Sequence, residues 1–111
     1  MNSRTNILVL NRNEGILEVI LRLINNHENW HGVGQSELNN LAHLLIKGHF
    51  DLLLIGSGFS PAEEQEIVKT SNELNPGIKI VHHWGGGSGL LTNEILAALE
   101  GVEGGNYEIM T

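Results

Sequence analysis

The stretch Phe50-Asp-Leu-Leu-Leu-Ile-Gly-Ser-Gly-Phe-Ser-Pro-Ala-Glu-Glu64 decides the fold. Its apolar run does not alternate with polar residues, which is typical of a strand that is buried on both faces of a sheet. Ser60, followed by a proline and then by Glu63, has the pattern of a helix capping box. A buried strand is therefore predicted to pass through a glycine turn at Gly56 directly into a helix, as in parallel α/β sheets.

The same alternation of strand and helix is predicted along the rest of the chain. Short apolar runs predict further strands, and apolar residues at spacings of three and four predict helices. The predicted strands lie at 7–10, 30–35 and 78–81, and the predicted helices at 14–26, from a capping Ser36 to Gly48, at 61–75 and at 92–100. With right-handed crossovers, these elements form a three-layer αβα sandwich around a parallel sheet.

The length and composition of the chain predict one globular domain that spans residues 1–111. Residues 101–111 are expected to be either a flexible tail or a short edge strand. The net charge of −7 and the six lysines and arginines argue against nucleic acid and acidic membrane surfaces as partners. The first apolar run is too short for a signal peptide, and no window is long enough to span a membrane, so a cytoplasmic location is expected.

The order of the segments resembles the response-regulator receiver domain of the CheY-like type, which has a flavodoxin-like fold. The resemblance rests on Ile7 to Glu14, Trp30 to Ser36 and Gly48 to Gly56, and it covers about residues 5–100. It implies the strand order 2-1-3-4. The fifth receiver strand would be shortened or missing, because only about thirty residues follow Val81. The last predicted helix would then be either the fourth or the fifth receiver helix.

In receivers, an acidic pair after the first strand holds magnesium, and an aspartate at the end of the third strand accepts a phosphoryl group. The resemblance places the acidic pair at Asn11 and Arg12, and it places the phosphoacceptor at Gly56. The Ser or Thr that contacts the phosphoryl group falls at His83 or Trp84. The resemblance therefore implies a vacated phosphorylation site, with no catalytic residues, no metal and no cofactor.

These features predict a non-enzymatic, receiver-like module for signalling or protein interaction that is not phosphorylated by the usual mechanism. One flank of the sheet is abbreviated, and an exposed edge strand needs cover. We therefore expect a homodimer that associates through this flank, and a protein partner in signalling.

The alternative is a small-ligand or metal-binding protein that uses the carboxyl edge of the sheet, where parallel sheets bind ligands. Its candidate residues are Asn11, Ser57, His82, His83, Trp84, Gly86 and Ser88. Adjacent strand residues point to opposite faces, so His82 and His83 do not easily chelate one metal. The glycine turn before residue 60 admits either a phosphate cradle or a structural turn. Two glutamates in the next helical turn would repel an anion and favour the structural turn.

Overall fold

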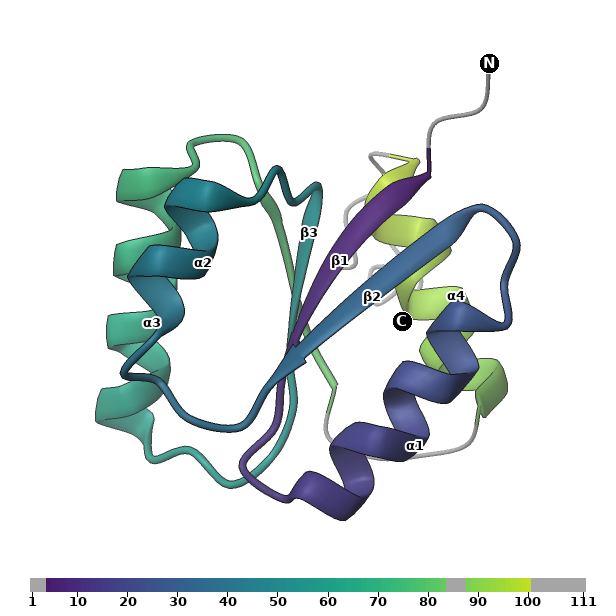
Figure 1. Cartoon of the computed structure of the whole chain (residues 1–111), viewed down its shortest axis with the longest axis horizontal. Helices are drawn as coiled ribbons and strands as arrows, with labels where there is room; N and C mark the ends of the chain where they lie inside the picture. The colour runs from purple at the N-terminus through teal and green to yellow at the C-terminus, as the bar shows by residue number, and fades with distance from the viewer. Residues whose placement is uncertain (1–3, 84–87, 101–111) are drawn as a thin grey trace, which may run out of the picture.

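The computed structural model describes residues 4–83 and 88–100 of the chain (Figure 1). A four-stranded parallel sheet has the order β2-β1-β3-β4, as the resemblance implied. The strands are β1 (Thr5–Leu10), β2 (Trp30–Gln35), β3 (Leu52–Ile55) and β4 (Lys79–His82). The helices are α1 (Glu14–Asn25), α2 (Leu41–Lys47), α3 (Pro61–Leu74) and α4 (Ser88–Leu99). The predicted αβα sandwich with a flavodoxin-like sheet is confirmed.

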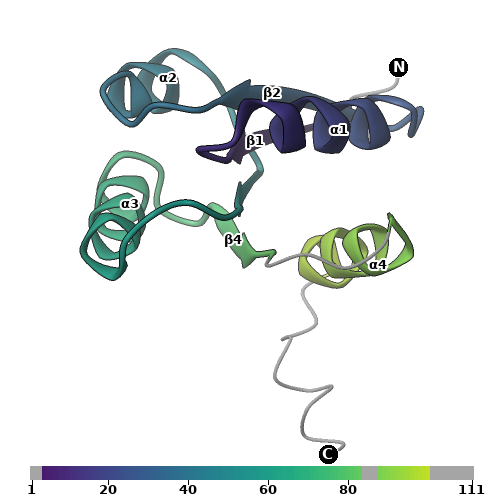
Figure 2. The ribbon, with the colours of Figure 1, turned by 90° about the horizontal axis from the view of Figure 1, so that it is seen from below.

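The sheet lies between two helical layers, with α1 and α4 on one face and α2 and α3 on the other (Figure 2). Ile7 and Val9 of β1 pack into the core beneath α1 and α4. Leu8 and Leu10 pack into the core beneath α2 and α3. Because both faces of β1 and β3 are buried, their apolar runs need no polar alternation.

The predicted capping box at the start of α3 is present. The Ser60 Oγ accepts a hydrogen bond from the Glu63 backbone N–H at 3.1 Å, and Glu63 Oε1 accepts one from the Ser60 N–H at 2.9 Å. Two N–H groups at this helix end are satisfied by side chains. The direction in which the chain leaves β3 is therefore fixed by local interactions.

Two predicted helix starts were wrong. The residue before α2 is Asn40, which makes no side-chain capping bond, and the predicted cap Ser36 instead donates a hydrogen bond to Glu14 Oε2 at 3.2 Å. The partner of Ser36 is distant in sequence, so the local pattern did not indicate it. α4 begins at Ser88 rather than at Thr92.

The position of α4 decides which receiver helix it corresponds to. Its residues Leu91 and Ile95 pack into the core on the α1 face. The fourth receiver helix connects β4 to a fifth strand on the outer side of β4. Because the step from β4 to that strand runs in the same direction as the step from β3 to β4, a right-handed crossover would place this helix on the same face as α3. α4 therefore corresponds to the fifth receiver helix and not to the fourth.

Other predictions fall on parts of the chain that the structure does not describe. The tail or edge strand expected at 101–111 lies outside the described residues, as do Trp84 and Gly86. None of the described helices is long and apolar enough to cross a membrane.

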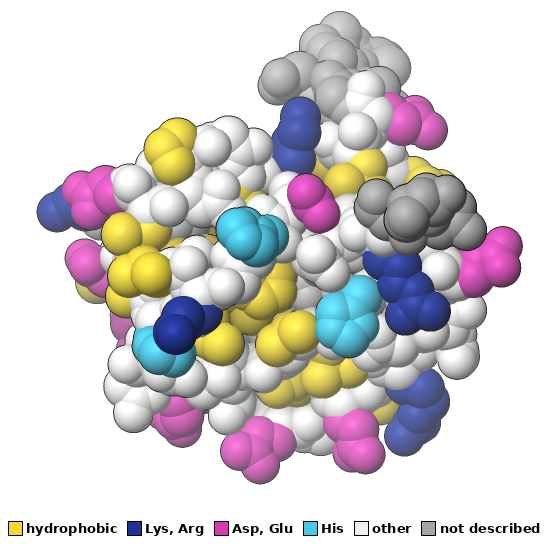
Figure 3. All heavy atoms as spheres, turned by 45° about the horizontal axis from the view of Figure 1, so that its top comes forward, with side chains coloured by type: hydrophobic (Ala, Val, Ile, Leu, Met, Phe, Trp, Pro, Cys, Tyr) yellow, Lys and Arg dark blue, Asp and Glu magenta, His cyan; other side chains and the backbone are white. Residues whose placement is uncertain are grey.

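The amino ends of the strands lie opposite the site predicted from the sequence and face the reader in Figure 3. Acidic, basic and histidine side chains are interspersed there with hydrophobic ones, and neither sign of charge gathers into a single area. The residues that the sequence predicts for the site lie at the other end of the sheet, after the carboxyl ends of the strands.

Candidate functional site

The loops after β1 and β3 are joined by backbone hydrogen bonds at the carboxyl edge of the sheet. The Gly56 N–H donates to the Leu10 carbonyl at 2.7 Å, and the Arg12 N–H donates to the Ser57 carbonyl at 3.1 Å. Pairing between the two segments thus continues past the ends of their strands. Asn11, Arg12 and Gly56, which the resemblance assigned to one site, are brought together here.

The side chain of Asn11 fills the space beside Gly56. Asn11 is only 2% exposed, and its Oδ1 accepts a hydrogen bond from the Asn13 N–H at 2.9 Å. A Cβ atom added to Gly56 would lie 2.3 Å from Asn11 Nδ2 and 3.1 Å from the Leu10 carbonyl oxygen. The space beside Gly56, where the resemblance placed the phosphoacceptor, is therefore filled by the neighbouring amide and is not open.

Arg12 crosses from the first loop to the third-strand loop. Its Nη2 donates to Glu63 Oε2 at 2.9 Å, and its guanidinium carbon lies 4.9 Å from the centre of the Phe59 ring. The backbone of Gly58 has φ +97°, and a Cβ added there would lie 2.4 Å from the Cβ of Arg12. A glycine at 58 permits both this left-handed conformation and the close approach of Arg12.

The Glu63 carboxylate is stabilised in its charged form. The hydrogen bond from the Ser60 backbone N–H is the largest cause that lowers the pKa of Glu63 below its ordinary value of 4.5, and the bond from Arg12 lowers it further. Glu63 therefore neutralises the guanidinium of Arg12, and it stands where an incoming anion would meet the start of α3.

His83 follows β4 and is buried against α4. It is 7% exposed, and its Nδ1 lies 2.6 Å from Oε1 of Glu94. Its backbone N–H donates to the Ile55 carbonyl at 2.9 Å. Glu94 was not among the residues predicted for the site. Its only signal was that Glu94 is the first acidic residue after His83.

The described residues of the ligand-binding alternative lie after β1, after β3, at the end of β4 and at the start of α4. Asn11 is buried beside Gly56, Ser57 is exposed, and His83 contacts Glu94. His82 is the partly buried last residue of β4, and Ser88 is the first residue of α4. Within residues 4–83 and 88–100, no group of three or more metal-binding side chains occurs. The ligand-binding alternative gains no support from this geometry.

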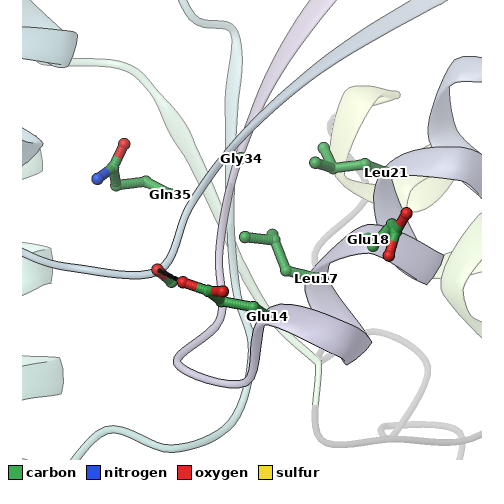
Figure 4. Close-up of a pocket in the computed structure, with 7 residues that line it drawn as sticks. Glu14, Leu17, Glu18, Leu21, Gly34 and Gln35 are labelled. Carbon is green, nitrogen blue, oxygen red and sulfur yellow. Dashed lines mark hydrogen bonds between the residues drawn. The ribbon is translucent and has the colours of Figure 1, made fainter.

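A shallow pocket of about 350 Å³ lies elsewhere, between α1 and the edge strand β2 (Figure 4). Leu17, Leu21 and Gly34 line it together with Glu14 and Glu18. A Cβ on Gly34 would lie 2.6 Å from Leu21 Cδ1, so the glycine lets α1 pack close to this strand. The sequence analysis did not single out this pocket.

Solved structures with the same fold include several receiver domains, although no family model and no curated protein sequence matches the chain significantly. A CheY-like receiver domain protein from Methanospirillum hungatei matches with a TM-score of 0.65 and 20% identity, over 86% of this chain and 76% of that one. A receiver domain protein from Clostridium thermocellum matches with a TM-score of 0.63 and 21% identity, over 87% and 76%. A putative pilus assembly-related protein from Burkholderia pseudomallei matches with a TM-score of 0.59 and 18% identity, over 88% and 75%. The chain therefore has a receiver-like, flavodoxin-like fold.

Proposed function

We propose that this chain is a non-enzymatic, receiver-like module for signalling or protein interaction, which is not phosphorylated by the receiver mechanism. We also propose that it acts in the cytoplasm as a homodimer and binds a protein partner. The observation that carries the proposal is the contact between Asn11 and Gly56. It leaves neither a carboxylate nor room for one at the phosphoacceptor position.

The charges around this position support the proposal. Magnesium in receivers is held by carboxylates, which are the ligands it prefers close to phosphate. The corresponding residues here are a buried amide, Asn11, and a guanidinium, Arg12, and neither supplies a carboxylate. The nearby carboxylate of Glu63 is already bound by Arg12 and by the Ser60 N–H.

The residue that follows β4 also supports the proposal. A receiver has a hydroxyl there that contacts the phosphoryl group. In this chain His83 is directed to Glu94, whose negative charge would repel a phosphoryl oxygen. The residues at the positions of the receiver phosphorylation site thus bind one another. We therefore expect the domain to act through its surface, by binding a protein partner.

The test is incubation of the full chain with acetyl phosphate and magnesium, followed by measurement of its intact mass. A receiver domain that has the acidic pair and the aspartate serves as the positive control. We expect the control to gain a phosphoryl group and this chain to remain unmodified. A stoichiometric, acid-labile adduct on this chain would overturn the proposal.

A further inference from the structure

The outer edge of β2 faces away from the rest of the sheet. β2 pairs only with β1, so the backbone N–H and C=O groups of its residues point alternately toward β1 and outward. The Asn11 N–H donates to the Gln35 carbonyl, which places Gln35 among the residues that face β1. By alternation, the backbone groups of Trp30, Gly32 and Gly34 point outward.

This edge is protected at its first two outward-facing residues and open at the third. The Trp30 N–H donates to the His27 carbonyl at 3.0 Å. The Gly32 N–H donates to Asn25 Oδ1 at 2.9 Å, and Asn25 Nδ2 donates to the Gly32 carbonyl at 3.5 Å. Among the residues that the structure describes, none forms a hydrogen bond with the outward N–H and C=O of Gly34. An unpaired N–H and C=O on an edge strand are a template for pairing with another chain.

Gly34 also borders the pocket between α1 and β2. Leu17 and Leu21 point from α1 toward β2 and give the pocket an apolar surface (Figure 4). A Cβ on Gly34 would lie 2.6 Å from Leu21 Cδ1, so Gly34 turns its α-carbon toward α1. The open backbone groups and the apolar surface are therefore adjacent.

The rim of the pocket is acidic. Glu14 and Glu18 line it from successive turns of α1. Glu14 Oε2 accepts a hydrogen bond from the Ser36 hydroxyl at 3.2 Å, which leaves its charge in place. The basic side chain beside Glu18 is Arg22, at 3.9 Å, and both side chains of this pair are more than half exposed. Such a pair contributes little, so the pocket keeps a negative potential that suits a cation.

We propose that an extended segment of a partner protein pairs antiparallel with β2 at Gly34 and places a lysine or arginine side chain in this pocket. In an antiparallel pair, one residue of the partner exchanges both hydrogen bonds with Gly34. Side chains of directly opposed residues lie on the same face of a sheet, so the partner's side chain lies on the α1 face. Its alkyl stem packs against Leu17 and Leu21, and its charge reaches the carboxylates at the rim.

A second copy of this chain is a poorer occupant of the same edge. Its own β2, Trp30-His-Gly-Val-Gly-Gln35, has no lysine or arginine, and the chain has a net charge of −7. Pairing of two β2 strands would bring the glutamates of both copies together, and like charges oppose such an approach. The inference rests on the protein partner in the proposed function and names its chemistry. β2 and β4 are opposite edges of the sheet, so this segment does not compete with a homodimer at the β4 flank.

The test is an NMR titration of the isotope-labelled full chain with the acetylated and amidated pentapeptide Thr-Val-Lys-Val-Thr. We expect the Gly34 amide proton to move downfield and the methyl signals of Leu17 and Leu21 to shift. Three control peptides have norleucine, glutamate or a backbone N-methylated lysine at the centre. Norleucine lacks the charge, and N-methylation removes the hydrogen bond to the Gly34 carbonyl. Each control should bind about fivefold more weakly or worse, the factor expected from losing exposed ion pairs or a hydrogen bond.

Two variants test the rim. Glu14→Gln with Glu18→Gln should weaken binding of the lysine peptide about fivefold and leave binding of the norleucine peptide unchanged. Glu66→Gln with Glu73→Gln, on α3, removes the same charge from exposed positions outside the pocket and is the matched control. Circular dichroism and thermal unfolding show whether each variant folds. The peptide series on the native chain decides the inference where a variant does not fold.

Each contrary result overturns the inference. A lysine peptide that leaves the Gly34 amide unmoved, or that binds no more tightly than the glutamate peptide, shows that this pocket does not take a basic segment. Equal weakening by the α3 control shows that only the net charge matters. A Gly34 amide that shifts with protein concentration in the absence of peptide shows that a second copy occupies the edge. None of these results bears on the acetyl phosphate experiment, which tests the proposed function separately.

Discussion

The side chain of Asn11 leaves no room for a side chain at Gly56, since a Cβ on Gly56 would lie 2.3 Å from Asn11 Nδ2. In a receiver both positions carry carboxylates. At the positions that the resemblance assigns to them, this chain has a buried amide, Asn11, and a residue without a side chain, Gly56. The two differences fit together sterically, so the altered site is packed like the rest of the core.

Gly56→Ala should destabilise the protein by about 1–3 kcal/mol, the usual cost of overpacking a core. The Asn11 side chain is the main obstacle, so the same substitution in an Asn11→Ala background should cost less by about 0.5 kcal/mol or more. Urea unfolding of the native chain, the two single variants and the double variant measures the coupling free energy between the two substitutions. Gly89→Ala is the control, because nothing lies within 4 Å of a Cβ at that helical position. Additive effects of the Asn11 and Gly56 substitutions would contradict the prediction.

Arg12→Lys should lower the free energy of unfolding by about 0.5–1 kcal/mol, since an ammonium group cannot stack as a guanidinium does on the Phe59 ring. The positive charge beside Glu63 is retained, but the hydrogen bond from Arg12 Nη2 changes as well, so the loss from stacking has to be separated from the loss at Glu63. A double-mutant cycle with Phe59→Leu measures it. If Arg12→Lys costs as much with leucine at 59 as with phenylalanine, the stacking contributes nothing.

The pKa of Glu63 is lowered in the folded protein, so its unfolded form binds a proton at a higher pH than its folded form does. Its stabilising contribution is therefore complete above the ordinary value of 4.5, and it is lost as the pH falls through the lowered pKa of the folded state. Glu63→Gln, which cannot titrate, should lose less stability than the native chain between about pH 5 and pH 3. Urea unfolding at a series of pH values tests this. Parallel curves for the two proteins would contradict it.

Glu94→Ala should destabilise the protein by about 1–3 kcal/mol, because it leaves the buried Nδ1 of His83 without its partner. Glu94→Gln keeps a hydrogen-bonding group at this position and should cost less. Since the pair joins the end of β4 to α4, hydrogen exchange should quicken first in the amides of α4. Asn93→Ala, at an exposed neighbouring position, is the control. If Glu94→Ala behaves like this control, the pair does not hold the helix.

Local patterns predicted correctly those parts of the fold whose interactions lie close together in sequence. The capping box joins Ser60 to Glu63, only three residues away. The apolar residues of β3 are consecutive, and this pattern by itself indicates a strand that is buried on both faces. Ser36 shows the limit of such reasoning. Its hydroxyl suits a helix cap, but it bonds Glu14, which lies 22 residues earlier in the chain.

The candidate site was predicted in part. The sequence showed that the chain lacks the acidic pair and the aspartate of the receiver pattern, because a missing carboxylate can be read from the residue type alone. It did not show that Asn11 fills the space beside Gly56, that Arg12 bonds Glu63 across 51 residues, or that Glu94 is the partner of His83. These contacts depend on which loops the sheet order brings together.

The sequence by itself thus determined the strand and helix alternation, the parallel sheet and the absence of carboxylates at the positions that the receiver resemblance assigns to phosphotransfer, because each depends on local patterns or on residue identity. Only the tertiary structure decided that α4 lies on the α1 face, that the Asn11 side chain fills the space beside Gly56, and that His83 contacts Glu94. The physical reason is that burial and charge neutralisation depend on distances between residues remote in the chain. Those distances are set by how the helices pack on the sheet.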